Sequence, residues 1–403
     1  MVFLKSIKLG GFLSFAPDSP AIELTPLNVL IGPNGAGKSN LIEAIEVLHA
    51  TPTSLSSLVR AGGSAQEWIW KGVPSAKLAS IEVDIEGTRK QARGHAYRLV
   101  FPEMSYRLRF AASNLSLEVI EESIVSAAKG ASVGSEKDFY YNLKRKGSHF
   151  SATGRGLQHR RTLPKGNDLV LDESILSQRK DPDTYPELSW LAPQFGRIQT
   201  FRDWTFGHSA PLRKPQRGDL PVDELLSNSD NLGLVLNELQ HHSVIERFNQ
   251  LMTRFLSRYE RFSTRIYGGA VQFFLHERGF KTPVPATRLS DGTIRFMAIL
   301  ALILSPTPPP LLCIEEPELG LHPDAVCLLA DLLVEASSRM QIIVTTHSDA
   351  LVSALTEEAG SVLVCDNRGG TVFERVNPSR LKRWLGKYRL GEIWRIGELG
   401  GNP

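Results

Sequence analysis

The chain has 403 residues, 42% of them hydrophobic and 22% charged, which is ordinary globular usage and excludes disorder of the chain as a whole. Its net charge of +3 is too small to indicate a nucleic-acid partner by itself, and its three cysteines have no disulfide or metal-ligand spacing. The longest apolar run, 296–304, is far shorter than the roughly 20 residues of a membrane-spanning helix, and the N-terminal residues do not have the pattern of a secretory signal. We therefore expect a globular protein of the cytoplasm with no membrane partner.

The predicted elements begin with a strand, a loop and a helix. Val29–Ile31 is a short apolar run of the kind that forms a strand covered on both faces, and residues 39–49 are compatible with a helix. The same order recurs near the other end of the chain, which predicts an α/β fold whose mixed sheet has central parallel strands flanked by helices. The recurring strands are Leu311–Ile314 and Gln341–Val344, and their helices are Asp324–Ser337 and Asp349–Leu355.

The region between these two halves has a different pattern. Segments near 81–85, 115–119 and 139–143 alternate apolar and polar residues, which predicts a lobe of antiparallel strands. Residues 232–239 and 244–259 have helical spacing and predict a helical insertion.

We expect one domain over 1–403 with a core that is discontinuous in sequence. The first part of the core is 1–110, the second is 283–403, and a strand-rich and helical insertion occupies 111–282. Within the insertion, Gly268-Gly269 lies between two strand-like runs and indicates a hairpin.

A basic segment also lies in the insertion. From 141 to 165 the chain has seven basic residues, two histidines and no acid. This pattern predicts contact with a nucleic-acid backbone, and a solvated flexible loop is an equally good interpretation, because charge runs are often only that. The candidate nucleic-acid contacts are Lys144, Arg145, Lys146, Arg160 and Arg161.

Gly32–Ser39 fits the pattern G-x-x-x-x-G-K-[ST], follows an apolar strand and opens a helix, as a phosphate-binding P-loop does. Its glycines let backbone N–H groups turn toward phosphates, and the positive end of the helix adds to the same place. We expect Lys38 to neutralise phosphate charge during catalysis and the Ser39 hydroxyl to coordinate Mg²⁺. The predicted ATP-binding residues are Pro33, Asn34, Gly35, Ala36, Gly37, Lys38, Ser39 and Asn40.

Leu312–Ile314 is followed directly by two acids and resembles a Walker B segment. We assign Glu315 to the metal shell and Glu316 to polarising the attacking water as general base. His347 closes the next strand, from where it is predicted to reach the γ-phosphate and to hold Glu316 and the water in line. Either a neutral or a protonated ring is suited to that role.

Leu289–Thr293 reads Leu-Ser-Asp-Gly-Thr and resembles the ABC signature, usually Leu-Ser-Gly-Gly-Gln, ahead of an apolar helix. Ser290, Asp291, Gly292 and the helix N-terminus would form an anion site for the γ-phosphate. In the ABC-type proteins that have this signature, the site faces ATP bound by the other subunit. The alternative for Ser290 is a plain helix N-cap.

With these motifs in order, the chain resembles the AAA_21-like ABC-type ATPases of the SMC, RecF and OLD class. The resemblance is carried by EEPELGLHP, TTHS and ATRLSDGT, and it is good over about the first 50 residues and 285–356. It implies an ABC-type P-loop NTPase core that uses ATP and Mg²⁺. It also implies a head-to-tail homodimer, or a higher even oligomer, with two nucleotides between P-loop and signature. The glutamine of the family's Q-loop is left unassigned between Gln194 and Gln199.

Two absences narrow the expected function. The insertion has no heptad run, so it is no SMC-type coiled-coil arm, and the 56 residues after His347 are fewer than the TOPRIM nuclease domain of OLD-like proteins needs. We therefore expect any nuclease to be a separate effector protein.

The leading hypothesis is an ATP-hydrolysing conformational switch in a DNA-related process, either repair or anti-phage defence. The alternative is a nucleotide-sensing regulatory module that controls a protein effector without nucleic-acid contact. The ATPase subunit of a transporter fits poorly, because the insertion is too long and too rich in strands.

Overall fold

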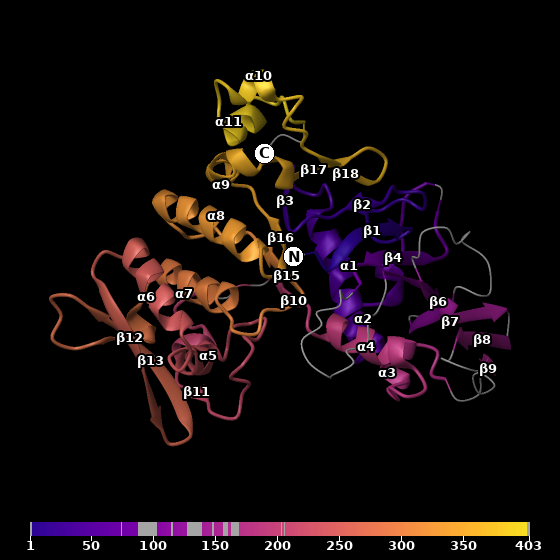
Figure 1. Cartoon of the computed structure of the whole chain (residues 1–403), viewed down its shortest axis with the longest axis horizontal. Coiled ribbons are helices and arrows are strands. Elements are labelled where there is room, and N and C mark those ends of the chain that lie inside the picture. The colour runs from indigo at the N-terminus through magenta and orange to yellow at the C-terminus, as the bar shows by residue number, and fades with distance from the viewer. Residues whose placement is uncertain are drawn as a thin grey trace, which may run out of the picture.

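The residues that the structure describes form three sheets (Figure 1). A central, mostly parallel sheet lies between an antiparallel sheet on one side and a helical lobe with its own small sheet on the other. The computed structural model describes residues 2–73, 75–87, 103–113, 116–126, 139–146, 149–155, 160–162, 169–202, 204 and 206–400, and their side chains outside 126–168.

The central sheet has six strands in the order β10-β15-β16-β3-β17-β18. The first five run parallel, and β18 is antiparallel to β17. In β16, Thr345 pairs with Glu315 on one side and with Leu30 on the other, so the carboxyl ends of three neighbouring strands lie in one row. The strands are β3 (Leu27–Ile31), β10 (Gln199–Phe201), β15 (Leu311–Glu315), β16 (Gln341–Thr345), β17 (Val362–Asn367) and β18 (Thr371–Arg375).

Four helices cover this sheet: α1 (Lys38–Ala50), α7 (Asp291–Ile303), α8 (Pro323–Ser337) and α9 (Asp349–Ala354). Alternate strand residues face two separate hydrophobic cores. In β3, for example, Val29 and Ile31 lie in the core shared with α7, α8 and α9, whereas Leu30 lies in the core shared with α1 and the antiparallel sheet. The strands covered on both faces are mostly apolar, as the sequence predicted, and the polar residues among them include Asn28 and Gln341.

The second sheet is antiparallel and has the order β2-β1-β4-β5-β6-β7-β8-β9. Met104, Tyr106, Leu108 and Phe110 alternate along β5 and are fully buried, so one face of this sheet packs on the core. Its strands are β1 (Leu4–Gly10), β2 (Ile22–Glu23), β4 (Ala79–Ile85), β5 (Met104–Ser113), β6 (Ser116–Ser126), β7 (Phe139–Lys146), β8 (His149–Arg155) and β9 (Arg160–Thr162). Helices α2 (Leu55–Ala61), α3 (Ile175–Gln178) and α4 (Pro186–Gly196) lie on the same side of the molecule (Figure 1).

The helical lobe combines α5 (Leu232–Leu239) and α6 (Val244–Phe255) with the strands β11 (Gln216–Arg217), β12 (Tyr259–Tyr267), β13 (Ala270–Glu277) and β14 (Val284–Pro285). The predicted hairpin at Gly268-Gly269 joins β12 to β13, and both glycines have positive φ. The helix predicted over 244–259 is wrong at its end, because Tyr259 begins β12. Tyr259 fits the helical spacing because it is buried in the same core, and its hydroxyl donates to Asn249 of α6.

The last helices are α10 (Lys382–Leu385) and α11 (Leu390–Arg395), which lie at the C-terminal end of the chain beside α9 (Figure 1). Trp394 of α11 is fully buried and anchors this end to the main core. Within the described ranges, no helix combines the length and the apolar character needed to cross a membrane.

Gln341 joins the central sheet to the antiparallel sheet. Its side chain is fully buried at the start of β16, and its Oε1 accepts hydrogen bonds from the N–H groups of Phe3 at 3.1 Å and Leu4 at 2.8 Å. Its Nε2 donates to the carbonyl oxygens of Leu4 at 2.8 Å and Thr25 at 3.1 Å. One amide thus satisfies four backbone groups that have little access to water.

The substitution Gln341→Met keeps the length of the side chain but removes all four hydrogen bonds. Because each buried backbone group left without a partner costs roughly 1–3 kcal/mol, we expect the free energy of unfolding to fall by about 3 kcal/mol or more. Urea unfolding followed by tryptophan fluorescence measures the loss. The control Gln240→Met removes an exposed amide and should change stability by less than about 0.5 kcal/mol. Equal midpoints for the two variants would contradict the role given to Gln341.

Candidate active site

The P-loop predicted at Gly32–Ser39 connects β3 to α1, and the helix begins at Lys38. Gly32 and Gly37 have φ of 141° and 111°, a region of backbone space that favours glycine. A Cβ on Gly37 would lie 2.1 Å from Thr371 Oγ1. The loop therefore needs glycine for its conformation and for its close approach to β18.

Lys38 lies on the inner side of this loop. Its side chain is 7% exposed, and its Nζ donates to the carbonyl oxygens of Gly32 at 2.7 Å and Pro33 at 3.0 Å. Burial lowers the pKa of Lys38, against the opposing effect of the nearby carboxylates Glu315 and Glu316. A phosphate oxygen is a stronger acceptor for an ammonium than a peptide carbonyl, so the arrangement suits an anionic ligand.

A hydrogen-bonded network behind the loop fixes its position. Thr371 Oγ1 donates to the carbonyl oxygen of Ala36 at 2.7 Å and lies 2.6 Å from Ser14 Oγ. Asn40, which was predicted among the ATP-binding residues, directs its Nδ2 to Ser14 Oγ at 2.7 Å. By contrast, Asn34 and Gly35 at the tip of the loop are exposed. The back of the loop is thus tied to the protein, and its tip is open to solvent.

Glu315 ends β15 opposite the P-loop. Its carboxylate accepts a hydrogen bond from Arg202 Nε at 3.2 Å, and the Ser39 hydroxyl lies near enough to affect its pKa. Arg202 also pairs through Nη1 with Glu46 of α1 at 2.9 Å. Burial raises the pKa of Glu315, while the Arg202 guanidinium and the Ser39 hydroxyl act in the opposite direction. The two residues predicted to bind Mg²⁺ therefore lie near each other.

The pair of Ser39 and Glu315 fits the ion that was predicted from the sequence. Mg²⁺ prefers oxygen ligands and commonly takes only one or two from the protein, with phosphates and water completing its shell. Among the described residues there is no group of three or more His, Cys, Asp or Glu that could hold a metal on its own. A Mg²⁺ ion held jointly by these residues and the phosphates would add positive charge beside the phosphates.

Glu316 and His347 face each other at the ends of neighbouring strands. His347 Nε2 lies 3.9 Å from Glu316 Oε1, too far for a hydrogen bond, and the two side chains are 30% and 36% exposed. Burial, with the nearby Lys38 cation, lowers the pKa of His347, against the opposing effect of Glu316. The imidazole is therefore neutral at neutral pH. Both side chains have access to water, which suits the predicted roles on a nucleophilic water.

Glu318 supports His347 from behind. It is 9% exposed, and its Oε1 accepts hydrogen bonds from the Thr346 hydroxyl and, at 3.3 Å, from the His347 N–H. The Thr346 hydroxyl in turn accepts from the Ser348 N–H at 2.9 Å. The turn that presents His347 is thus held by a buried carboxylate only two residues after Glu316.

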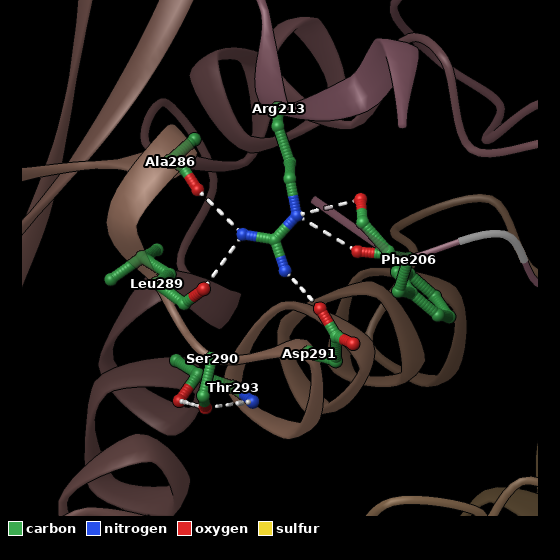
Figure 2. Close-up of polar contacts among 8 residues, drawn as sticks. Phe206, Arg213, Ala286, Leu289, Ser290, Asp291 and Thr293 are labelled. Carbon is green, nitrogen blue, oxygen red and sulfur yellow. Dashed lines mark hydrogen bonds and ion pairs between the residues drawn. The ribbon is translucent and has the colours of Figure 1, made fainter. Parts of the chain in front are cut away.

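The predicted signature residues lie at the start of α7 (Figure 2). Ser290 is the N-cap of this helix, and its Oγ accepts a hydrogen bond from the Thr293 N–H at 3.1 Å. The capping role considered for Ser290 therefore holds, and an anion site at this helix N-terminus stays a prediction. Gly292 lies so close to the loop after β15 that a Cβ on it would be 2.6 Å from the Gly320 carbonyl oxygen.

Arg213 braces the signature from the other side. Its side chain is 3% exposed, and Figure 2 shows its guanidinium between the loop before α7 and residues just after β10. It donates to the carbonyl oxygens of Ala286 at 3.0 Å and Leu289 and pairs with Asp291. It also donates to the carbonyl oxygens of Phe206 at 2.8 Å and Gly207. One buried cation thus fixes the backbone around the signature, and Asp291 is its ion-pair partner.

The candidate nucleic-acid contacts fall in the antiparallel sheet. Lys144, Arg145 and Lys146 belong to β7, and Arg160 and Arg161 belong to β9. Their side chains lie outside the described part of the structure, and other residues of the basic segment lie outside it altogether. Backbone placement in a sheet leaves contact with nucleic acid as a prediction.

Sequence analysis missed Arg202, Arg213 and Arg295. Arg202 and Arg213 lie outside the motifs, Arg295 follows the signature in an apolar helix, and the partners of each lie elsewhere in the sequence. One signal was available for Arg202, since it lies just after Gln199, a candidate for the Q-loop glutamine. Arg202 follows β10 and contacts Glu315, whereas Gln199 begins β10 and Gln194 lies in α4.

Comparison with known families gives one match over most of the chain. The model of the family described as "AAA_21: AAA domain, putative AbiEii toxin, Type IV TA system" matches residues 27–353. The matched region includes the P-loop, the signature, both acids and His347.

Similar proteins of known name match this chain over different lengths. The chromosome partition protein Smc of Coxiella burnetii is 34% identical over 96 residues, which are 23% of this chain and 8% of that protein. The Old nuclease of Escherichia phage P2 is 36% identical over 73 residues, which are 18% of this chain and 12% of that protein. An ATP/GTP phosphatase of Helicobacter pylori is 20% identical over 370 residues, or 88% of each chain. The chain thus matches only a small part of Smc and of the Old nuclease.

A solved structure confirms the fold. The Smc head domain from Pyrococcus furiosus, with an extended coiled coil and bound to the C-terminal domain of ScpA, superposes with a TM-score of 0.56 and 15% identity. The alignment covers 96% of this chain and 99% of that one. The predicted ABC-type core, with central parallel strands, flanking helices and an antiparallel lobe, is therefore confirmed.

Proposed function

Because the chain belongs to the AAA_21 family, and its fold is that of an SMC-type ATPase head, we propose that it binds and hydrolyses ATP with Mg²⁺ and uses this cycle as a conformational switch. The observation that carries the proposal is the meeting of Lys38, Ser39, Glu315, Glu316 and His347 at one edge of the central sheet. In open α/β sheets, ligands bind at the carboxyl ends of the strands.

In the proposed reaction each residue has a separate role. The loop N–H groups and Lys38 bind the phosphates, and Ser39 and Glu315 hold Mg²⁺. Glu316 would polarise the attacking water, and neutral His347, 3.9 Å from Glu316, would orient the water and the γ-phosphate. Arg202 would keep Glu315 ionised, since the nearby cation counteracts the effect of burial on its pKa.

We further propose that the complete site forms between two copies of the chain. The polar contacts of Ser290 and Asp291 go to Thr293 and Arg213, whereas those of Lys38 stay within its own loop. The anion site at the start of α7 is thus left for a ligand from outside. A head-to-tail pair would place it on the γ-phosphate bound by the partner subunit, and two-fold symmetry would create two such sites.

The process served by this switch is proposed to be DNA-related, either repair or anti-phage defence, in the cytoplasm and with a separate effector such as a nuclease. The basic segment and the similarity to parts of Smc and the Old nuclease support this proposal. A regulatory module that controls a protein effector without nucleic acid is the competing proposal. The two proposals differ in whether the ATP-bound form should bind nucleic acid or only a protein effector.

Mixing two inactive variants tests the composite site. Lys38→Ala removes the phosphate cation, and Ser290→Arg blocks the signature, so each variant alone should lose hydrolysis. In a mixed dimer one site carries both defects, while the other combines an intact P-loop with an intact signature. We therefore expect phosphate release to return in the mixture to a fraction of the wild-type rate. If the mixture stays as inactive as its parts over all protein ratios, the head-to-tail arrangement is wrong.

The variant Glu316→Gln tests the general base. Loss of one well-placed electrostatic group typically costs about 3 kcal/mol, so single-turnover phosphate release should slow by roughly 100-fold while ATP binding is kept. The slow variant should accumulate as a dimer with ATP and Mg²⁺, measured by light scattering on a sizing column, and should stay monomeric with ADP. An undiminished rate would remove Glu316 as the base.

Gel mobility at several salt concentrations tests for nucleic acid. If the basic segment contacts a phosphate backbone, binding of DNA or RNA by the Glu316→Gln form should depend on ATP and weaken with salt. Neutralising the segment should lower both the affinity and the salt dependence. The neutralised residues are Lys144, Arg145, Arg160 and Arg161.

A matched control removes four exposed basic residues at the C-terminal end, namely Arg380, Lys382, Arg383 and Lys387. Binding that is lost equally in both variants indicates general charge attraction. If no ATP-dependent binding occurs at low salt, the nucleic-acid proposal fails, and a pull-down with the Glu316→Gln form should then recover a protein effector.

A further inference from the structure

Arg295 lies one turn into α7, just after the signature, and its side chain returns to the catalytic acids. The residue is 9% exposed, and its Nη1 donates to the carbonyl oxygen of Glu316 at 3.0 Å. Its guanidinium also lies over the rings of Phe206 and Trp204, at 5.0 Å and 5.6 Å from their centres. These contacts hold the charged end in one place, because an arginine stacked on aromatic rings loses its freedom to turn.

The peptide that Arg295 contacts is strained. Glu316 has φ of 45°, in the left-handed region that a residue with a Cβ rarely adopts, and such a backbone costs about 1–3 kcal/mol unless its surroundings impose it. Its N–H donates to the Thr345 carbonyl oxygen at 3.0 Å, and its own carbonyl oxygen accepts from the Leu319 N–H at 3.2 Å as well as from Arg295. Hydrogen bonds on both sides of Glu316 thus hold the turn that aims its carboxylate.

Among these contacts, only the one from Arg295 comes from the signature helix. Thr345 belongs to β16, and Leu319 belongs to the loop after β15. The signature and this loop also touch directly, since Gly292 leaves no room for a Cβ beside the Gly320 carbonyl oxygen. A movement of α7 would therefore displace the Glu316 peptide of the same chain, through the Arg295 hydrogen bond and through the contact of Gly292 with Gly320.

We propose that Arg295 is a positioning residue that couples the signature helix to Glu316 within one chain. This inference rests on the proposed function, in which the signature grips the ATP of the partner subunit. ATP bound by one subunit then fixes α7 of the other subunit, whose signature contacts it. In that other subunit, Arg295 of α7 holds the turn that aims Glu316 in the second site. The two hydrolysis sites of the dimer are thereby made to depend on each other.

The experiment compares Arg295→Met and Arg295→Lys with the wild type. Both variants should keep ATP affinity and ATP-dependent dimerisation, because Lys38 and Ser290 are untouched. Turnover should fall by on the order of 10- to 100-fold in Arg295→Met, as for other groups that orient a functional residue, with KM little changed. Cooperativity in the dependence of rate on ATP should fall with it. Lysine keeps a donor near the Glu316 carbonyl oxygen and should restore part of the rate.

Two controls separate coupling from simple loss of structure. Arg254→Met removes an arginine from an exposed ion pair with Asp331, at 3.7 Å on the surface of α6, and should leave turnover and cooperativity unchanged. Introducing Arg295→Met into the Glu316→Gln background should slow the residual reaction little further, because a residue that acts through Glu316 has nothing left to orient.

The outcomes divide cleanly. Wild-type turnover and cooperativity in Arg295→Met, with the dimer intact, would overturn the coupling and leave the proposed function standing. An equal rate loss in the wild-type and Glu316→Gln backgrounds would also overturn it, since the arginine would then act on the structure at large. If the wild-type protein itself neither dimerises with ATP nor hydrolyses it, the proposed function fails first.

Discussion

The site depends on the register of three parallel strands. β16 lies between β3 and β15, and its last residue, Thr345, pairs with Leu30 and Glu315. The chain leaves all three strands at the same edge, so the P-loop, the acid pair and His347 are delivered to one place by backbone hydrogen bonds alone. A slip of one residue in any strand would turn its last side chain to the opposite face. The hydrophobic cores on both faces of the sheet prevent such a slip.

Burial then determines the chemistry of the delivered groups. It lowers the pKa values of Lys38 and His347 and raises that of Glu315. For His347 this favours the neutral imidazole, which can share a proton with water. For Glu315 the Arg202 guanidinium opposes the effect of burial. The same low-dielectric edge strengthens every contact to a phosphate that enters it.

The parts of the site that the sequence predicted are those whose residues are adjacent in the sequence. A P-loop or an acid pair after a strand consists of adjacent residues, so the pattern and its geometry are read together. The buried arginines could not be found this way. Arg213 reaches the signature from more than 70 residues away, as its hydrogen bond to Leu289 shows, and no local pattern announces such a contact. The helix predicted over 244–259 was wrong at Tyr259 because a local pattern was present but misleading. Tyr259 has helical spacing, yet it enters the core from a strand.

The segment from Arg202 to Arg213 contacts both halves of the proposed composite site. At its start Arg202 pairs with Glu315, in its middle Trp204 and Phe206 pack against Arg295, and at its end Arg213 holds the loop before α7. The predicted metal-site acid and the signature are therefore linked by one short stretch of chain with an arginine at each end, Arg202 partly buried and Arg213 buried. Because a buried arginine without its partners costs several kcal/mol, this stretch cannot release one end without rearranging the contacts around it. The contacts that would link the proposed nucleotide site to the signature thus lie in a region where the sequence has no motif.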